Sequence, residues 1–245
     1  MSLLRTEELT KEFDSIRAVD SVSFELREGE VTSIIGPNGA GKTTFYDLLA
    51  GDLQPTKGKI FFRGTDITPF APHEIAREGI IRAYQIRNFF PELTVFENIQ
   101  SALIAREKNE LIMHRPTESL DDINKSAREW LERGKLSAMS NVKSSTLNYG
   151  DQKRLEVLMT MSMEPELAIL DEPTAGMSPE ETEELVEFID DFANKTNIFL
   201  TEHDMDVVRQ ISDRILVLHE GSLIAGGTPE EIQNDSDVRE VYLGG

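Results

Sequence analysis

One glycine-rich stretch has the residue types and the spacing that bind phosphate groups. It reads Gly36-Pro37-Asn38-Gly39-Ala40-Gly41-Lys42-Thr43-Thr44 and fits the pattern G-x-x-x-x-G-K-[ST]. Glycines let the backbone turn its N–H groups toward an anion, and a helix that begins there adds partial positive charge. In this pattern Lys42 reaches the β- and γ-phosphates, and the Thr43 hydroxyl binds Mg²⁺. The residues expected to contact the phosphates or the metal are Gly36, Asn38, Gly39, Ala40, Gly41, Lys42, Thr43 and Thr44.

Two carboxylates follow a second apolar run, residues 167–170. Asp171 stands at the end of this predicted strand, where it suits a water-mediated Mg²⁺ contact. Glu172, one residue on, suits the base that polarises an attacking water. Because Pro173 follows, the alternative interpretation is a strand that ends in a solvated turn. The phosphate-binding loop elsewhere in the chain favours the chemical interpretation.

Two further polar side chains come directly after predicted strands. His203 follows the strand predicted at 197–201, and the carboxyl ends of parallel strands face the ligand crevice. There an imidazole can hydrogen-bond a γ-phosphate oxygen and help to hold the water. Gln85 follows the strand predicted at 80–84, and its amide oxygen can accept a Mg²⁺ contact and release it when the loop moves.

The elements that must position these residues can also be predicted. Residues 30–35 form a β-branched run typical of a buried strand, and 44–50 predict a helix that ends at Gly51. Asn148 is a plausible N-cap for a helix that continues to Met161, and Gly150 in its first turn allows close backbone approach to an anion.

Composition limits the classes of protein that remain. The chain has 245 residues, long enough for a substantial core, and no cysteine, which excludes disulfides and thiolate zinc sites. No apolar run approaches a membrane span, and the first residues lack the apolar core of a signal peptide. The net charge of −20 makes nucleic acid a poor partner, so we expect no nucleic-acid binding.

Taken together and in this order, the motifs resemble those of an ABC transporter ATPase subunit. They are the loop at 36–43, Gln85, a signature segment at 147–152, the strand and carboxylates at 167–172, and His203. Finer details resemble the ATPases of branched-chain amino acid importers and the similar urea or short-amide importers. These details lie at 149–156, 171–179, 202–205 and 237–244. The urea branch stays an open alternative, supported by 175–177 and 218–222.

The resemblance implies one α/β domain, residues 1–245, with a RecA-like P-loop core at 29–85 and 165–227. It implies an antiparallel β-subdomain at about 1–28, an inserted helical subdomain at 86–164, and C-terminal helices at 228–245. Phe13, with Val19 as a second candidate, would contact the adenine ring of ATP, since stacking on an aromatic side chain tolerates any base. The implied cofactors are ATP and Mg²⁺, the latter bound by Thr43, Gln85 and Asp171.

The resemblance also implies partners. A second ATPase subunit would face the first head to tail, so that Asn148, Gly150 and Asp151 of one subunit cover the ATP of the other. Permease subunits, and through them an extracytoplasmic solute-binding protein, would place the chain peripherally on the cytoplasmic face of the membrane. Phe89 or Phe90 would dock the permease, although burial in the helical subdomain is the alternative.

The signature segment departs from the family pattern at two positions. Asn148 replaces its usual serine, and Tyr149 replaces its second glycine. An asparagine amide can donate a hydrogen bond similar to that of serine, with longer reach. Asn148 thus leaves a non-hydrolysing scaffold as one competing interpretation. A soluble regulatory or ribosome-associated ATPase is another, although such proteins usually carry two fused nucleotide domains.

Overall fold

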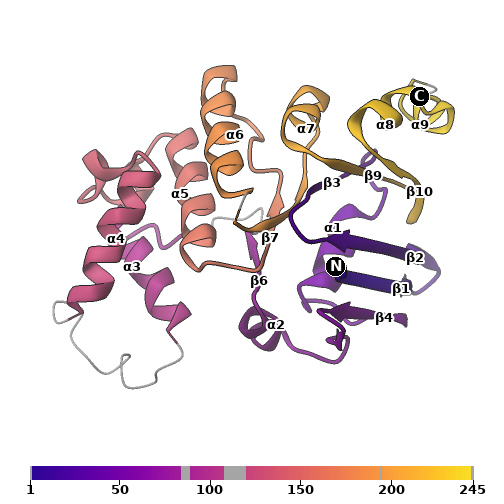
Figure 1. Ribbon diagram of the computed structural model, residues 1–245, viewed down its shortest axis with the longest axis horizontal. Helices are drawn as coiled ribbons and strands as arrows, with labels where there is room; N and C mark the ends of the chain where they lie inside the picture. The colour runs from indigo at the N-terminus through magenta and orange to yellow at the C-terminus, as the bar shows by residue number, and fades with distance from the viewer. Residues whose placement is uncertain (1, 84–88, 108–119, 194, 244–245) are drawn as a thin grey trace.

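The computed structural model describes residues 2–83, 89–107, 120–193 and 195–243 of the chain, with side chains described up to residue 240. Gln85 therefore lies outside the described residues. Two sheets and the helices beside them form a mixed α/β structure (Figure 1). In the described part of the chain, no helix combines the length and apolar character that crossing a membrane requires.

The smaller sheet has four strands in the order β2-β1-β4-β5. β1 (Ser2–Phe13) and β2 (Ile16–Arg27) form an antiparallel hairpin within the expected range 1–28. β4 (Lys57–Phe62) and β5 (Thr65–Asp66) extend the sheet with residues that the sequence assigned to the RecA-like core. β4 joins this sheet because its side chains alternate between two faces. Ile60 and Phe62, on one face, are buried among the same apolar residues as the inward side chains of β1.

The larger sheet carries the candidate site. Its six strands follow the order β10-β9-β3-β8-β7-β6. The five neighbours β9 (Arg214–His219), β3 (Val31–Ile35), β8 (Asn197–Thr201), β7 (Leu167–Asp171) and β6 (Ile80–Ala83) run parallel, and β10 (Ser222–Gly227) pairs antiparallel at the edge. Every residue of β3 and β7 is buried, as expected for central parallel strands. The residues that come directly after these strands therefore meet along one edge of the sheet.

Nine α-helices of the described residues lie around the sheets. The first two are α1 (Lys42–Leu49) and α2 (Pro72–Glu78). α3 (Val95–Arg106), α4 (Asp121–Arg133) and α5 (Tyr149–Ser162) pack together on the side opposite β1, β2 and β4 (Figure 1). The remaining helices are α6 (Pro179–Ala193), α7 (Met205–Ile211), α8 (Pro229–Asn234) and α9 (Ser236–Leu243).

The acidic helix α6 shows how the helical group is joined to the core. Its residues Leu185, Ile189 and Phe192, spaced at i, i+4 and i+7, are buried on one face, as in an amphipathic helix. Phe192 stacks on Trp130 of α4, with ring centroids 5.5 Å apart. Arg133 lies over the same two rings. Aromatic packing thus ties α4 to a helix of the core.

Candidate nucleotide-binding site

The glycine loop connects β3 to α1 and is packed against neighbouring backbone. Gly41 precedes α1 with φ of +101°, a conformation that favours glycine. A Cβ atom there would lie 2.2 Å from the carbonyl oxygen of Ala18, and one at Gly36 would lie 2.1 Å from that of Leu218. The Gly221 N–H, which also lies beside Ala18, donates to the Ala40 carbonyl at 2.9 Å. Gly36 and Gly41 are therefore required by close packing against neighbouring backbone.

Lys42 folds back over this loop. Its Nζ donates hydrogen bonds to the carbonyl oxygens of Gly36, at 2.6 Å, and Pro37, at 3.1 Å. Burial lowers the pKa of the Lys42 ammonium, while Glu172 and Asp171 act in the opposite direction. A cation that is partly stripped of water in a loop of backbone N–H groups suits an anionic ligand.

Asp171 is held at the end of β7. Thr201, on the neighbouring strand β8, donates its hydroxyl to Asp171 Oδ1 at 2.9 Å. The carboxylate is almost completely buried. Thr43, in the first turn of α1, is exposed. A hydroxyl and a carboxylate are hard oxygen donors of the kind that Mg²⁺ prefers, so the residues present fit this metal.

Glu172 and His203 are brought into direct contact. Glu172 has φ of +49°, which turns the chain away from the direction of β7, and its N–H is held by the carbonyl and hydroxyl oxygens of Thr201, each at 3.1 Å. His203 Nε2 lies 2.7 Å from Glu172 Oε1. Both side chains stay accessible, at 20% exposure for Glu172 and 52% for His203. Water can therefore reach the pair.

Two charged residues at this edge of the sheet were not predicted from the sequence. Glu202 is buried and accepts the Thr174 N–H at Oε1, at 2.8 Å, so it joins the turn after β7 to the segment that carries His203. Burial raises the pKa of Glu202, against hydrogen bonds from Thr174 and His203. The second is Arg82 of β6, whose guanidinium reaches Asp171. An acidic residue at the end of an apolar strand was the available signal for Glu202.

The signature segment forms the start of α5. Asn148 caps this helix by accepting the Asp151 N–H at 2.7 Å, which confirms the predicted N-cap. At Gly150, a Cβ would lie 2.4 Å from Oε1 of Glu181 on α6, so the flexible end of that side chain would have to shift to admit one. The three predicted nucleotide contacts, Asn148, Gly150 and Asp151, lie at the start of α5, a helix that Figure 1 shows well apart from α1. They are not brought to the site formed by Lys42 and Glu172.

The two predicted adenine contacts differ in accessibility. Phe13, at the end of β1, is 43% exposed, and the Lys11 ammonium lies 5.2 Å from its ring centroid. Val19 is fully buried in β2 among the apolar residues of the smaller sheet, so it cannot stack on a base. The expectation for Val19 was wrong because the inward face of β2 includes this position. Asn38 and Gly39, at the tip of the loop, are exposed.

Known proteins share both the fold and the motifs. A family model described as ABC transporter matches residues 19–175, and one described as branched-chain amino acid ATP-binding cassette transporter matches residues 222–245. The high-affinity branched-chain amino acid transport ATP-binding protein LivG of Salmonella typhimurium is 44% identical, over 99% of this chain and 98% of that protein. The Pseudomonas aeruginosa protein BraF, described in the same words, is 38% identical with the same coverage.

A solved structure extends the likeness to three dimensions. It is the ADP conformation of an ATP-binding cassette of an ABC transporter, with a TM-score of 0.89, 30% identity and 100% coverage of both chains. The fold and the site define an ATP-binding cassette, a module that binds and hydrolyses ATP. The chain belongs to the ATP-binding subunits of ABC transporters, in the family of LivG and BraF.

Proposed function

We propose that the chain supplies ATP hydrolysis to an importer of branched-chain amino acids. The observation that carries the catalytic part is the 2.7 Å contact between His203 and Glu172, beside the glycine loop and Asp171. The solute is supported by full-length similarity to LivG and by the match of the C-terminal residues 222–245. A urea or short-amide solute is the second candidate, since residues 175–177 and 218–222 resemble that branch.

The residues take distinct roles in hydrolysis. The loop N–H groups and Lys42 bind the phosphates, with the Gly36, Asn38, Gly39, Ala40, Gly41, Thr43 and Thr44 positions forming the cradle. Glu172 accepts a proton from the attacking water, and His203 holds Glu172 and the water in line. Thr43 and Asp171 would hold Mg²⁺, which when bound neutralises charge on the phosphates. Gln85, the third proposed metal contact, lies outside the described residues.

The separation of α5 from the loop supports a dimer. Because Asn148, Gly150 and Asp151 do not reach their own loop, they fit a role in covering the ATP of a second subunit placed head to tail. ATP would then hold two subunits together, and hydrolysis would release them. Such closing and opening is a large two-state motion that permease subunits can convert into transport.

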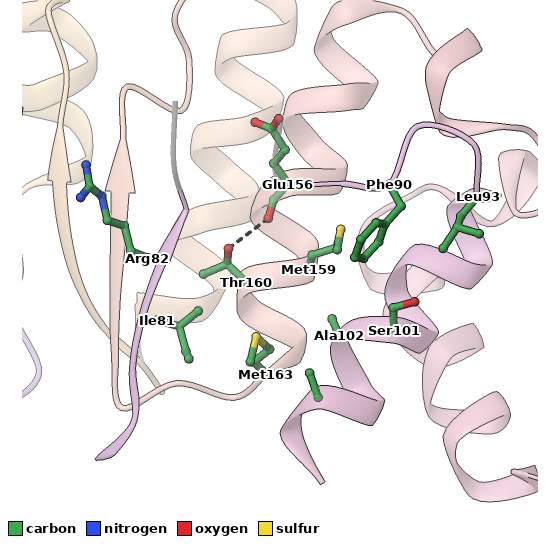
Figure 2. A pocket seen from close by; sticks show the side chains of 11 residues that line it. Ile81, Arg82, Phe90, Leu93, Ser101, Ala102, Glu156, Met159, Thr160 and Met163 are labelled. Carbon is green, nitrogen blue, oxygen red and sulfur yellow. Dashed lines mark hydrogen bonds between the residues drawn. The ribbon is translucent and has the colours of Figure 1, made fainter. Parts of the chain in front are cut away.

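A groove beside α3 and α5 is the proposed docking surface for the permease. Its cavity of about 460 Å³ is largely apolar and is walled by β6, α3, α5 and the chain before α3 (Figure 2). Phe90 is 56% exposed at this groove, whereas Phe89 is buried in the core of the helical subdomain. Of the two aromatic residues considered from the sequence, Phe90 is thus the one available to a permease helix. The groove is adjacent to the end of β6, from which the chain leads to Gln85.

This function places the chain peripherally on the cytoplasmic face of the membrane, bound to permease subunits and served by an extracytoplasmic solute-binding protein. Membrane association that depends on the permease separates it from a soluble regulatory ATPase. Uptake of labelled leucine and labelled urea, in cells that carry Lys42→Ala in place of the native chain, tests the solute. Loss of leucine uptake alone supports the proposal, and loss of urea uptake alone supports the alternative. If neither changes, both solutes are excluded.

A further inference from the structure

Arg82 is a buried arginine that contacts three carboxylates from different parts of the core. Its side chain is 5% exposed. Nη1 lies 2.5 Å from Oδ1 of Asp47 on α1 and 3.4 Å from Oδ2 of Asp52, just after α1. Nη2 lies 3.5 Å from Oδ2 of Asp171. The guanidinium therefore bridges the helix that begins at Lys42 and the strand that ends at Asp171.

Asp171 is held from both sides as a result. Its strand β7 lies between β6 and β8 in the sheet. Thr201 of β8 donates to Oδ1, and Arg82 of β6 approaches Oδ2. Each carboxylate oxygen thus has a donor from a different neighbouring strand. A planar guanidinium that is itself fixed by two other carboxylates fixes the plane of the third.

We propose that Arg82 is a positioning residue for Asp171, and that it sets the orientation in which this carboxylate serves the Mg²⁺ of the nucleotide. The inference depends on the metal role proposed for Asp171. Groups that orient a metal ligand typically change metal affinity by about 10–100-fold when they are removed. Arg82 would act through Asp171 alone, without touching metal or nucleotide.

Two simpler roles for Arg82 lead to different results. If it serves only to hold α1 against β6, its loss lowers stability and leaves the Mg²⁺ dependence of binding unchanged. If it serves only to balance charge, its loss leaves Asp47, Asp52 and Asp171 as an uncompensated negative cluster, and Mg²⁺ binds more tightly. A positioning role gives the opposite sign, because a misoriented carboxylate binds Mg²⁺ more weakly.

The test is equilibrium binding of a non-hydrolysable ATP analogue to the full chain, measured by calorimetry over a series of Mg²⁺ concentrations and in EDTA. The variants are Arg82→Gln and Arg82→Lys. Arg63→Gln is a matched control, because Arg63 also pairs with a carboxylate, Glu166 at 2.6 Å, but on the surface. Thermal unfolding of each variant reports stability separately.

For Arg82→Gln we expect the Mg²⁺ concentration at half-maximal binding to rise about tenfold, with binding in EDTA unchanged. Arg82→Lys should raise this Mg²⁺ concentration by a smaller factor. An ammonium keeps the positive charge but lacks the planar set of donors with which a guanidinium orients carboxylates. Arg63→Gln should match the wild type. If the Mg²⁺ concentration at half-maximal binding is unchanged or lower in the Arg82 variants, the inference is overturned. If Arg82→Gln does not fold, the lysine variant decides by the same criterion.

Failure of the metal site itself gives a separate signature. Wild-type binding that does not respond to Mg²⁺ contradicts the proposed roles of Thr43 and Asp171, and the role of Arg82 falls with them. A wild-type response to Mg²⁺ that both arginine variants reproduce contradicts the role of Arg82 alone.

Discussion

Replacing Glu172 by glutamine isolates one step of the proposed chemistry. Glutamine keeps the size of the side chain and an oxygen that can accept the 2.7 Å contact from His203. The bonds that fix the turn come from the Glu172 backbone N–H to Thr201, so the substitution leaves them in place. The amide oxygen cannot, however, accept the proton of the attacking water. The perturbation is therefore confined to general-base catalysis.

A positioned base contributes about 10²–10⁴-fold to rate. At about 1.4 kcal/mol for each factor of ten, the loss corresponds to roughly 3–5 kcal/mol in the activation free energy. ATP affinity should stay close to that of the wild type, because Lys42 and the glycine loop are untouched. The variant should therefore bind ATP, hydrolyse it very slowly, and accumulate as an ATP-bound dimer.

The assay is single-turnover hydrolysis of ATP by the purified full chain, with size-exclusion chromatography in ATP for the dimer. Glu164→Gln is the control, because Glu164 has the same φ of +49° but pairs with Arg106 on an exposed surface. This control should hydrolyse ATP at the wild-type rate. Since Glu172 and His203 touch, changing both should cost less than the sum of the single changes.

A Glu172→Gln variant that hydrolyses ATP at the wild-type rate would refute the assignment of the base. Equal losses of hydrolysis rate in Glu172→Gln and Glu164→Gln would show that replacing any glutamate with this backbone conformation lowers the rate. The effect at Glu172 would then not be due to loss of a catalytic base. Strict additivity of the Glu172 and His203 changes would contradict the view that the two side chains act as one unit.

Four further predictions concern single residues. Lys42→Ala should abolish binding of fluorescent ATP, and near-normal turnover would rule out its role. Gly41→Ala should lower the free energy of unfolding in denaturant by about 1–3 kcal/mol, from strain at φ of +101° and a 2.2 Å clash; an unchanged midpoint would contradict this. Phe90→Ala should reduce solute uptake with no loss of thermal stability or of isolated ATPase activity, whereas a lowered melting temperature would assign Phe90 to the core. Burial raises the pKa of Glu202, so its contribution to stability is present below the ordinary value of 4.5 and lost as pH rises through the native pKa. The stability of Glu202→Gln, measured in denaturant titrations, should therefore increase relative to that of the wild type over this rise in pH. A stability difference that does not change with pH would contradict this prediction.

The chemistry-bearing edge of the core sheet could be predicted because its signals are local. The uninterrupted burial of β3 and β7 is predicted by short apolar runs, and a parallel sheet then places the residues after those runs at one edge. Glu172 and His203 come from different strands, yet each is marked by its own strand end. The structure adds the contact between them.

The residues that were missed depend on partners far away in the sequence. Arg82 lies in an apolar strand, and only the fold shows that Asp47 and Asp171 surround it. Gly150 was predicted as a nucleotide contact, but its closeness to the Glu181 side chain of another helix is likewise visible only in the fold. The position of β4 in the smaller sheet likewise depends on pairing with β1 across the whole loop and α1. No local pattern carries such information.

Strand β6 lies between the groove and the part of the sheet that carries Asp171. Ile81 and Arg82 line the same groove as Phe90, and the Arg82 guanidinium points away from that groove (Figure 2). Its Nη2 lies 3.5 Å from Oδ2 of Asp171. A helix seated in the groove would press on the same short strand that steadies the carboxylate behind it. A force applied to β6 from the groove would thus change the orientation of Asp171 on the other side of the strand, through Arg82 alone.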